Sequence, residues 1–302
     1  MLTSNETYAA EQLALYQSSR QGAYTITNRS GNTVAFLPLP NITADYQSII
    51  DFAKSQSITS VYPASVEPSI RAGYLAQREI ILGLYASTSS SVQETGYGSG
   101  TVLPITLVKP LSRGSAHINS KDVFDPPLID FGALSDPTDL ETLIASIRKN
   151  RDLVASPPMQ ELTPTELVPG AQLTSDGQLG AALRQMAVPT YAHPCCTCAM
   201  MKREFGGVVS PDLLVYGVKG LSVVDASMMP LIPATHLSAT VYAVAEKVGL
   251  FPFRLLCVNK EVLTAVCVVG GRYDQSPSWA PLATYPLAYL TWGISRDAMF
   301  QS

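Results

Sequence analysis

The sequence is poor in charge: Asp, Glu, Lys and Arg make up 15% of its 302 residues, against roughly 25% in ordinary globular chains. Its net charge is −4, and it contains no cluster of Lys and Arg of the kind that binds nucleic acid or anionic lipid. No apolar run reaches the roughly 18 residues that a membrane-spanning helix needs. We therefore expect neither a nucleic-acid partner nor a membrane partner.

Cysteine is also scarce, with five residues in the chain. The cysteines are Cys195, Cys196, Cys198, Cys257 and Cys267. Three of them crowd beside His193 in a CC-x-C spacing that is too short for the CxxC pairs of structural zinc, and the whole set does not form a disulfide framework. We predict that the chain binds no metal. The first residues lack the basic start and apolar core of a secretion signal, and the sequence does not indicate a compartment.

A glycine-rich phosphate loop is missing as well. Residues 96–100 read GYGSG, but a GxGxxG loop continues into a helix, and this stretch leads toward an apolar, β-branched segment. We interpret the Ser- and Gly-rich residues 88–100 as a loop.

The hydrophobic pattern predicts helices and strands that alternate irregularly, which is typical of the α+β class. The predicted helices cover 5–18, 43–55, 66–87, 137–155, 177–187 and 237–248. A predicted strand in 101–110 is expected to pair across a turn with GSAHINS at 114–120, and a second strand is expected at 221–225. The Pro-rich residues 157–170 are interpreted as a connector.

Two of the three histidines lie in phrases that are typical of a redox site. His193 begins HPCCTCAMM, which is followed by GGVV at 206–209 and VVDAS at 223–227, and His236 lies in PATHLSATVY at 233–242. Histidine is the usual base for an alcohol proton because it titrates near neutral pH.

The order of these phrases resembles the C-terminal signature of the glucose–methanol–choline (GMC) flavin oxidoreductases, and the resemblance covers roughly residues 5–248. It implies a GMC substrate domain with an antiparallel sheet and flanking helices in 1–187, and a C-terminal segment of the FAD-binding domain in 188–248. Because the dinucleotide-binding unit is missing, we expect this chain to be the second half of such an enzyme. Residues 249–302 resemble nothing in the family, and we interpret them as an unrelated tail, mispredicted or disordered.

The resemblance also implies roles for individual residues. His193 matches the general base and His236 matches the second active-site position, which binds the substrate oxygen. Asp225, Ala226 and Ser238 match contacts to the cofactor, FAD. Structural alternatives stand beside these roles: a buried histidine next to a turn for His193, a helix cap for His236, and an ordinary turn that Asp225 caps.

Two further polar residues are interpreted structurally. His117 is expected on the surface or opposite a neighbouring strand. Arg113 is expected in a turn, with a carboxylate partner as the alternative.

The function that follows is FAD-dependent oxidation of the CH–OH group of a small-molecule alcohol, with hydride passing to the flavin and His193 as base. Two alternatives remain open. One is a cyclase of secondary metabolism that uses the same fold, and the other is a truncated product without activity. The sequence does not indicate an oligomeric state.

Overall fold

The computed structural model describes residues 5–25, 33–97, 103–122, 124–161, 163–250 and 265–266. Nearly all of the predicted tail, with Cys257 and Cys267, therefore lies outside the described residues. The α-helices are α1 Glu6–Ser19, α2 Leu39–Ile42, α3 Tyr46–Ser55, α4 Pro68–Tyr85, α5 Pro137–Val154, α6 Pro157–Gln160, α7 Asp176–Met186 and α8 Leu237–Leu250. The strands are β1 Thr33–Leu37, β2 Gln93–Tyr97, β3 Ile105–Leu107, β4 Ser115–His117, β5 Leu128–Asp130, β6 Leu221–Ser222 and β7 Ala265–Val266.

The central sheet is antiparallel, in the order β1-β2-β3. Its register places Glu94 of β2 opposite Phe36 of β1 and Thr106 of β3. The sheet corrects two predictions. Part of the predicted loop 88–100 is the central strand β2, and β3 pairs with β2, whereas β4 pairs with β5.

Strand β2 was missed because its buried side chains are polar. Gln93 and Thr95 are 0% and 1% exposed, and their side chains contact Asn150 of α5 at 3.4 and 3.3 Å. Side chains alternate along a strand, so Glu94 points to the opposite face of the sheet. The strand buries polar groups that find their hydrogen-bond partners far along the chain, and no local pattern marks it.

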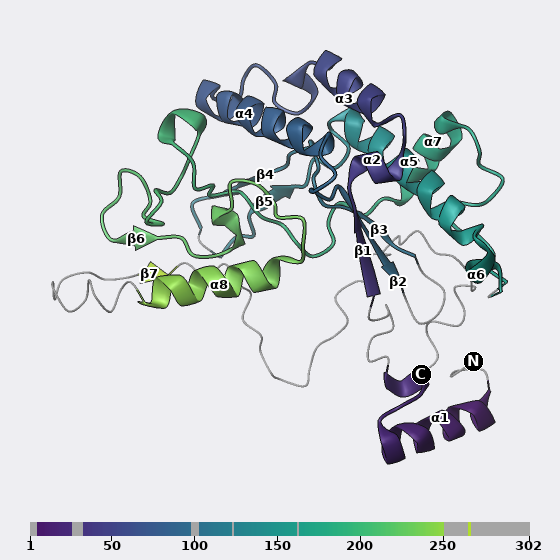
Figure 1. The fold of residues 1–302 in the computed structure, drawn as a ribbon. Helices are drawn as coiled ribbons and strands as arrows, with labels where there is room; N and C mark the ends of the chain where they lie inside the picture. The colour runs from purple at the N-terminus through teal and green to yellow at the C-terminus, as the bar shows by residue number, and fades with distance from the viewer. Residues whose placement is uncertain are drawn as a thin grey trace.

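Helices α3, α4, α5 and α7 lie over the sheet, as the upper part of Figure 1 shows. One core cluster joins α2, α3 and α4, and a second joins α5 and α7. Three of these helices begin at side-chain caps, which are Glu67 for α4, Asp136 for α5 and a Ser175–Gln178 capping box for α7. Pro follows the first two caps, where its missing N–H costs nothing. The predicted helices in this part are confirmed.

Helix α1 is also confirmed, and Asn5 caps it by accepting the N–H of Tyr8 at 3.0 Å. It buries no residue and lies apart from the sheet in Figure 1. Its apolar side chains are therefore only partly covered, and Leu13 is 41% exposed.

The segment from 188 onward is mostly irregular. It contains two short 3-10 helices, η3 Arg203–Phe205 and η4 Ala226–Met228, and ends in α8. Of the strand predicted at 221–225, residues 221–222 form a strand, β6. The predicted connector 157–170 includes the short helix α6. Taken together, the elements confirm the α+β class.

His117 lies exposed on β4, opposite Leu128 of β5, as predicted. Arg113 was expected in a turn, but it lies in an irregular segment before β4 and donates to the carbonyl oxygens of Pro110 and Ser112 at 2.7 and 2.9 Å. Within the described ranges, no helix has the length and apolar character to cross a membrane.

Candidate active site

Main-chain hydrogen bonds join the loop after His193 to the loop before His236. The N–H groups of Cys196, Cys198 and Met200 donate to the carbonyls of 226, 227 and 228 at 3.2, 2.9 and 2.8 Å. The donors are alternate residues of the first loop, and the acceptors are the three consecutive carbonyls of η4. These bonds bring two phrases together although about 30 residues separate them in the sequence.

The GGVV and VVDAS phrases contribute Val209 and Val223 to the apolar core under these loops. The cluster consists of Val209, Leu213, Val223, Met228, Met229 and Leu237, and all three cysteines of the His193 loop contact its edge. Gly207 is required for a close approach, since an added Cβ would overlap the carbonyl oxygen of Met201. The sequence motif therefore has a packing role as well as any chemical one.

Two side chains from the sheet and helix region hold the loop between η4 and α8. Gln77 of α4 donates to the carbonyl oxygen of Pro230 at 2.7 Å. Lys109 donates from Nζ to the carbonyl oxygen of Ile232, also at 2.7 Å. Burial lowers the pKa of Lys109. Both contacts fix the chain just before His236.

The two histidines meet directly. His193 Nε2 lies 2.7 Å from His236 Nδ1, and the ring centroids are 5.0 Å apart with the planes at 82°. The other ring nitrogen of His193, Nδ1, lies 2.8 Å from the carbonyl oxygen of Ala192. The sequence separates the two rings by 43 residues, and the fold places them in one hydrogen-bond chain.

Glu94 extends this chain. Its Oε1 lies 3.1 Å from Nε2 of His236. The Glu94 side chain is 7% exposed, whereas that of His236 is 46% exposed. Glu94 therefore anchors, from the buried sheet, a ring that is open to solvent.

The hydrogen-bond partners assign the protons on the rings. A carbonyl oxygen only accepts, so His193 carries its proton on Nδ1 and its Nε2 is the acceptor. The proton between the rings consequently belongs to His236 Nδ1. The contact of His236 Nε2 with Glu94 needs one further proton, which the imidazole and the carboxyl group share. The base lone pair of this chain thus lies on Nε2 of His193.

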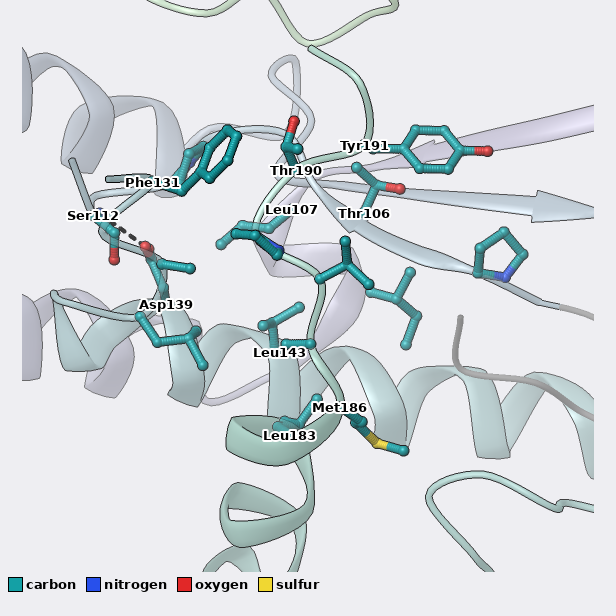
Figure 2. A pocket seen from close by; sticks show the side chains of 18 residues that line it. Thr106, Leu107, Ser112, Phe131, Asp139, Leu143, Leu183, Met186, Thr190 and Tyr191 are labelled. Carbon is teal, nitrogen blue, oxygen red and sulfur yellow. Dashed lines mark hydrogen bonds between the residues drawn. The ribbon is translucent and has the colours of Figure 1, made fainter. Parts of the chain in front are cut away.

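Tyr191 lies beside both histidines, with ring centroids 6.2 Å from His193 and 6.0 Å from His236. It also lines an apolar cavity of about 220 Å³ between β3, α5 and α7. Figure 2 shows Thr106, Thr190 and Tyr191 at one end of this cavity and Leu183 and Met186 at the other.

One acidic group lines the cavity. Burial raises the pKa of Asp139 to about 6, although hydrogen bonds from Ser112 and Leu111 oppose the rise. Its carboxylate accepts the main-chain N–H groups of these two residues, each at 2.8 Å. Asp139 thus has the partners of a structural residue.

The three residues predicted to contact the cofactor lie near the histidines along the chain. The Asp225 carboxylate accepts the N–H of Ser227 at 2.8 Å and caps η4. Ala226 begins η4 and accepts the N–H of Cys196. Ser238 is exposed in the first turn of α8. For Asp225 the structure thus shows the capping contact that the structural alternative requires.

The residues around α8 fit one end of FAD. Both ring nitrogens of His236 face His193 and Glu94, so the ring leaves the N–H groups of the first turn of α8 uncapped by its own nitrogens. Such a turn carries partial positive charge and donor groups that suit the polar edge of an isoalloxazine. The diphosphate would need a glycine-rich loop, and the 302 residues contain no GxGxxG. The residues around α8 therefore fit the isoalloxazine end of FAD and not its diphosphate.

A metal centre has no geometric support in the part of the chain that the structure describes, where no group of three His, Cys, Asp or Glu side chains could hold an ion. Cys195 and Cys196 contact each other instead, with their sulfur atoms 3.0 Å apart.

Sequence reasoning missed Glu94 and Tyr191. Glu94 lay in the segment interpreted as a loop, and only the tertiary contact shows that its side chain meets His236. Tyr191 had a weak signal, because it is an aromatic residue two positions before the predicted base.

Comparison with known proteins gives consistent matches. The model of a family described as GMC oxidoreductase matches residues 110–245. The dehydrogenase xptC of Emericella nidulans is 36% identical over 246 residues, which cover 81% of this chain and 40% of that protein.

Two solved structures are similar to this fold. An FAD-dependent oxidoreductase from Chaetomium thermophilum matches with a TM-score of 0.77 and 39% identity, over 84% of this chain and 44% of that one. A fungal aryl-alcohol oxidase matches with a TM-score of 0.73 and 35% identity, over 85% of this chain and 44% of that one. The chain thus spans less than half the length of each of these proteins.

Proposed function

Because the chain belongs to the GMC oxidoreductase family and corresponds to a C-terminal part of its members, we propose that it supplies the acid–base half of a flavin-dependent alcohol oxidation site. FAD is the cofactor of this family. The observation that carries the proposal is the hydrogen-bond chain from Ala192 through His193 and His236 to Glu94.

In this proposal His193 is the base. Its Nε2 has the lone pair that accepts the hydroxyl proton, and the Ala192 carbonyl holds the ring in that tautomer. His236 donates from Nδ1 to the same hydroxyl oxygen. Two such hydrogen bonds to one oxygen require ring nitrogens about 4.7 Å apart. These two nitrogens now lie 2.7 Å apart, so the rings must turn away from each other to admit the alcohol.

Glu94 is a positioning residue. It keeps its contact with Nε2 of His236 from a fixed strand, so the exposed ring turns about a defined anchor. Tyr191 contributes an aromatic wall beside both rings. The apolar lining of the adjoining cavity favours an alcohol with an aryl or other apolar body.

FAD, when bound, would accept hydride from the carbon that carries the hydroxyl group. The first turn of α8 with Ser238, and the η4 segment with Ala226, would hold its flavin end. Asp225 would act there through the η4 turn that it caps. For the diphosphate of FAD, the 302 residues contain no GxGxxG loop.

The experiment is anaerobic reduction of FAD, added to the purified chain, by aryl and alkyl alcohols. We expect loss of the visible flavin absorbance with wild type. His193→Ala should slow that loss by about 10²- to 10⁴-fold, the usual contribution of a general base.

A matched control is His117→Ala, which removes the exposed histidine of β4 and should leave the rate unchanged. Equal rates for wild type and His193→Ala at equal FAD occupancy would refute the role of His193. Product formation without any change in flavin absorbance would favour the cyclase alternative.

A further inference from the structure

The cysteine pair beside the candidate base has no part in the proposed oxidation. Cys195 and Cys196 are adjacent in the sequence, and their Sγ atoms lie 3.0 Å apart. A disulfide has an S–S length of about 2.05 Å, so an approach of about 1 Å would bring the two atoms to bonding distance.

The backbone holds both thiols on one side of the chain. Adjacent side chains in an extended segment normally point in opposite directions. Cys196 has a φ of 73°, in the left-handed region that residues with a Cβ atom rarely adopt. Its N–H also donates to Ala226 at 3.2 Å. This conformation, held by the neighbouring loop, directs Cys196 toward Cys195.

The surroundings favour a reactive thiolate in the pair. The hydrogen bond from Cys195 lowers the pKa of Cys196, and the positive charges of Arg113 and Lys109 act in the same direction, although burial opposes them. The same hydrogen bond raises the pKa of Cys195. One sulfur is therefore the better nucleophile, and the other keeps its proton.

Both cysteines are half-buried, and the residues that flank them, Pro194 and Thr197, are exposed. A small oxidant can therefore reach the sulfur atoms. Cys198 is equally half-buried and lies two residues further along. It offers a control within the same loop.

We propose that Cys195 and Cys196 form a reversible oxidation site that closes to a vicinal disulfide with hydrogen peroxide. The Cys196 thiolate attacks one peroxide oxygen and releases hydroxide, which gives a sulfenic acid. The Cys195 thiol then displaces water from that sulfur and forms the S–S bond. Overall, two thiols and one peroxide give one disulfide and two waters. Both sulfur atoms are oxidised, and the peroxide is reduced.

The test is mass spectrometry of the native chain after brief exposure to hydrogen peroxide, followed by alkylation of free thiols. Trypsin cleavage after Arg184 and Lys202 places all three cysteines of the loop in one peptide, 185–202. We expect this peptide to lose two hydrogens and to carry a single alkyl group, on Cys198. Dithiothreitol added before alkylation should restore three alkyl groups.

Variants and denaturation separate the proposal from general thiol oxidation. Cys198→Ser should keep the loss of two hydrogens, whereas Cys195→Ser and Cys196→Ser should abolish it. Unfolding in urea should remove the preference for the adjacent pair, which we expect to be about tenfold or more in the native protein. Three alkyl groups on the peroxide-treated native wild type would overturn the proposal. A native disulfide that includes Cys198 would also overturn it.

Discussion

Glu94 and His236 should be energetically coupled in the folded protein, and a double-mutant cycle measures that coupling. The four proteins are wild type, Glu94→Ala, His236→Ala and the double variant. Each single change removes one end of the 3.1 Å contact between Oε1 and Nε2. The difference between the summed single effects and the double effect isolates the interaction.

The exposure of the two side chains sets the expected size. A hydrogen bond that involves a charged group contributes about 1.5–3 kcal/mol when it is buried, and exposed ion pairs contribute about 0.2–1 kcal/mol. Glu94 is 7% exposed, but His236 is 46% exposed, so water screens one end of the contact. We expect a coupling free energy of about 1 to 1.5 kcal/mol, between the two ranges.

Urea unfolding at neutral pH supplies the four free energies of unfolding. The matched control is the cycle for Arg148 and Asp176, a pair whose side chains are 48% and 67% exposed. That cycle should give less than about 0.5 kcal/mol. If the Glu94–His236 coupling falls within the additivity error of about 0.3 kcal/mol, the two side chains do not interact as the structure shows, and the positioning role of Glu94 fails.

Three further predictions concern single positions. Because burial raises the pKa of Asp139 to about 6, above the unfolded value of about 3.9, its stabilising contribution should be complete below about pH 4 and lost as pH rises through 6. The unfolding free energy of wild type relative to Asp139→Asn should thus fall by about 3 kcal/mol between pH 4 and 7, and a difference independent of pH would contradict this. Arg78→Met should cost about 3–5 kcal/mol in urea unfolding, because it leaves the buried Asp136 without its cation; a cost below about 1 kcal/mol, as expected for Arg148→Met, would argue against a buried ion pair. In the flavin-reduction assay His236→Asn should retain more activity than His236→Ala, since an amide can still donate to the alcohol oxygen, and equal losses would argue against that hydrogen bond.

The helices could be predicted because their signals are local. Glu67-Pro68 and Asp136-Pro137 each combine a capping side chain with a proline at the first helical position. Apolar residues then follow at helical spacing, and both helices begin and end within two residues of the expected bounds. The information needed lies within the helix itself.

Strand β2 could not be predicted because its stabilising partners lie elsewhere in the chain. Gln93 and Thr95 meet Asn150, 57 and 55 residues away. Glu94 meets His236, 142 residues away. Its five residues are mostly polar and include a glycine, and local sequence signals of this kind predict a loop. Only the tertiary contacts make its burial favourable.

The candidate site also depends partly on local sequence signals and partly on contacts between distant parts of the chain. The family resemblance predicts both histidines as site residues because each lies in a contiguous sequence phrase. The neighbouring phrases also contain Val209 and Val223 of the supporting core. The resemblance does not predict which ring nitrogens carry protons. That depends on the Ala192 carbonyl at one end of the chain of hydrogen bonds and on the Glu94 carboxylate at the other.

Exchanging either end group should therefore affect the protonation of His193 without changing His193 itself. A carbonyl that only accepts keeps the proton on Nδ1 of His193, so His236 donates from Nδ1, and the further proton that His236 Nε2 shares with the Glu94 carboxyl group leaves that Nδ1 proton in place. With both ends fixed, the one nitrogen lone pair left in the chain is on Nε2 of His193. The positions of the donors and of the acceptor in the site thus depend on the main-chain carbonyl of Ala192 and on Glu94, which lies outside the phrases around the histidines.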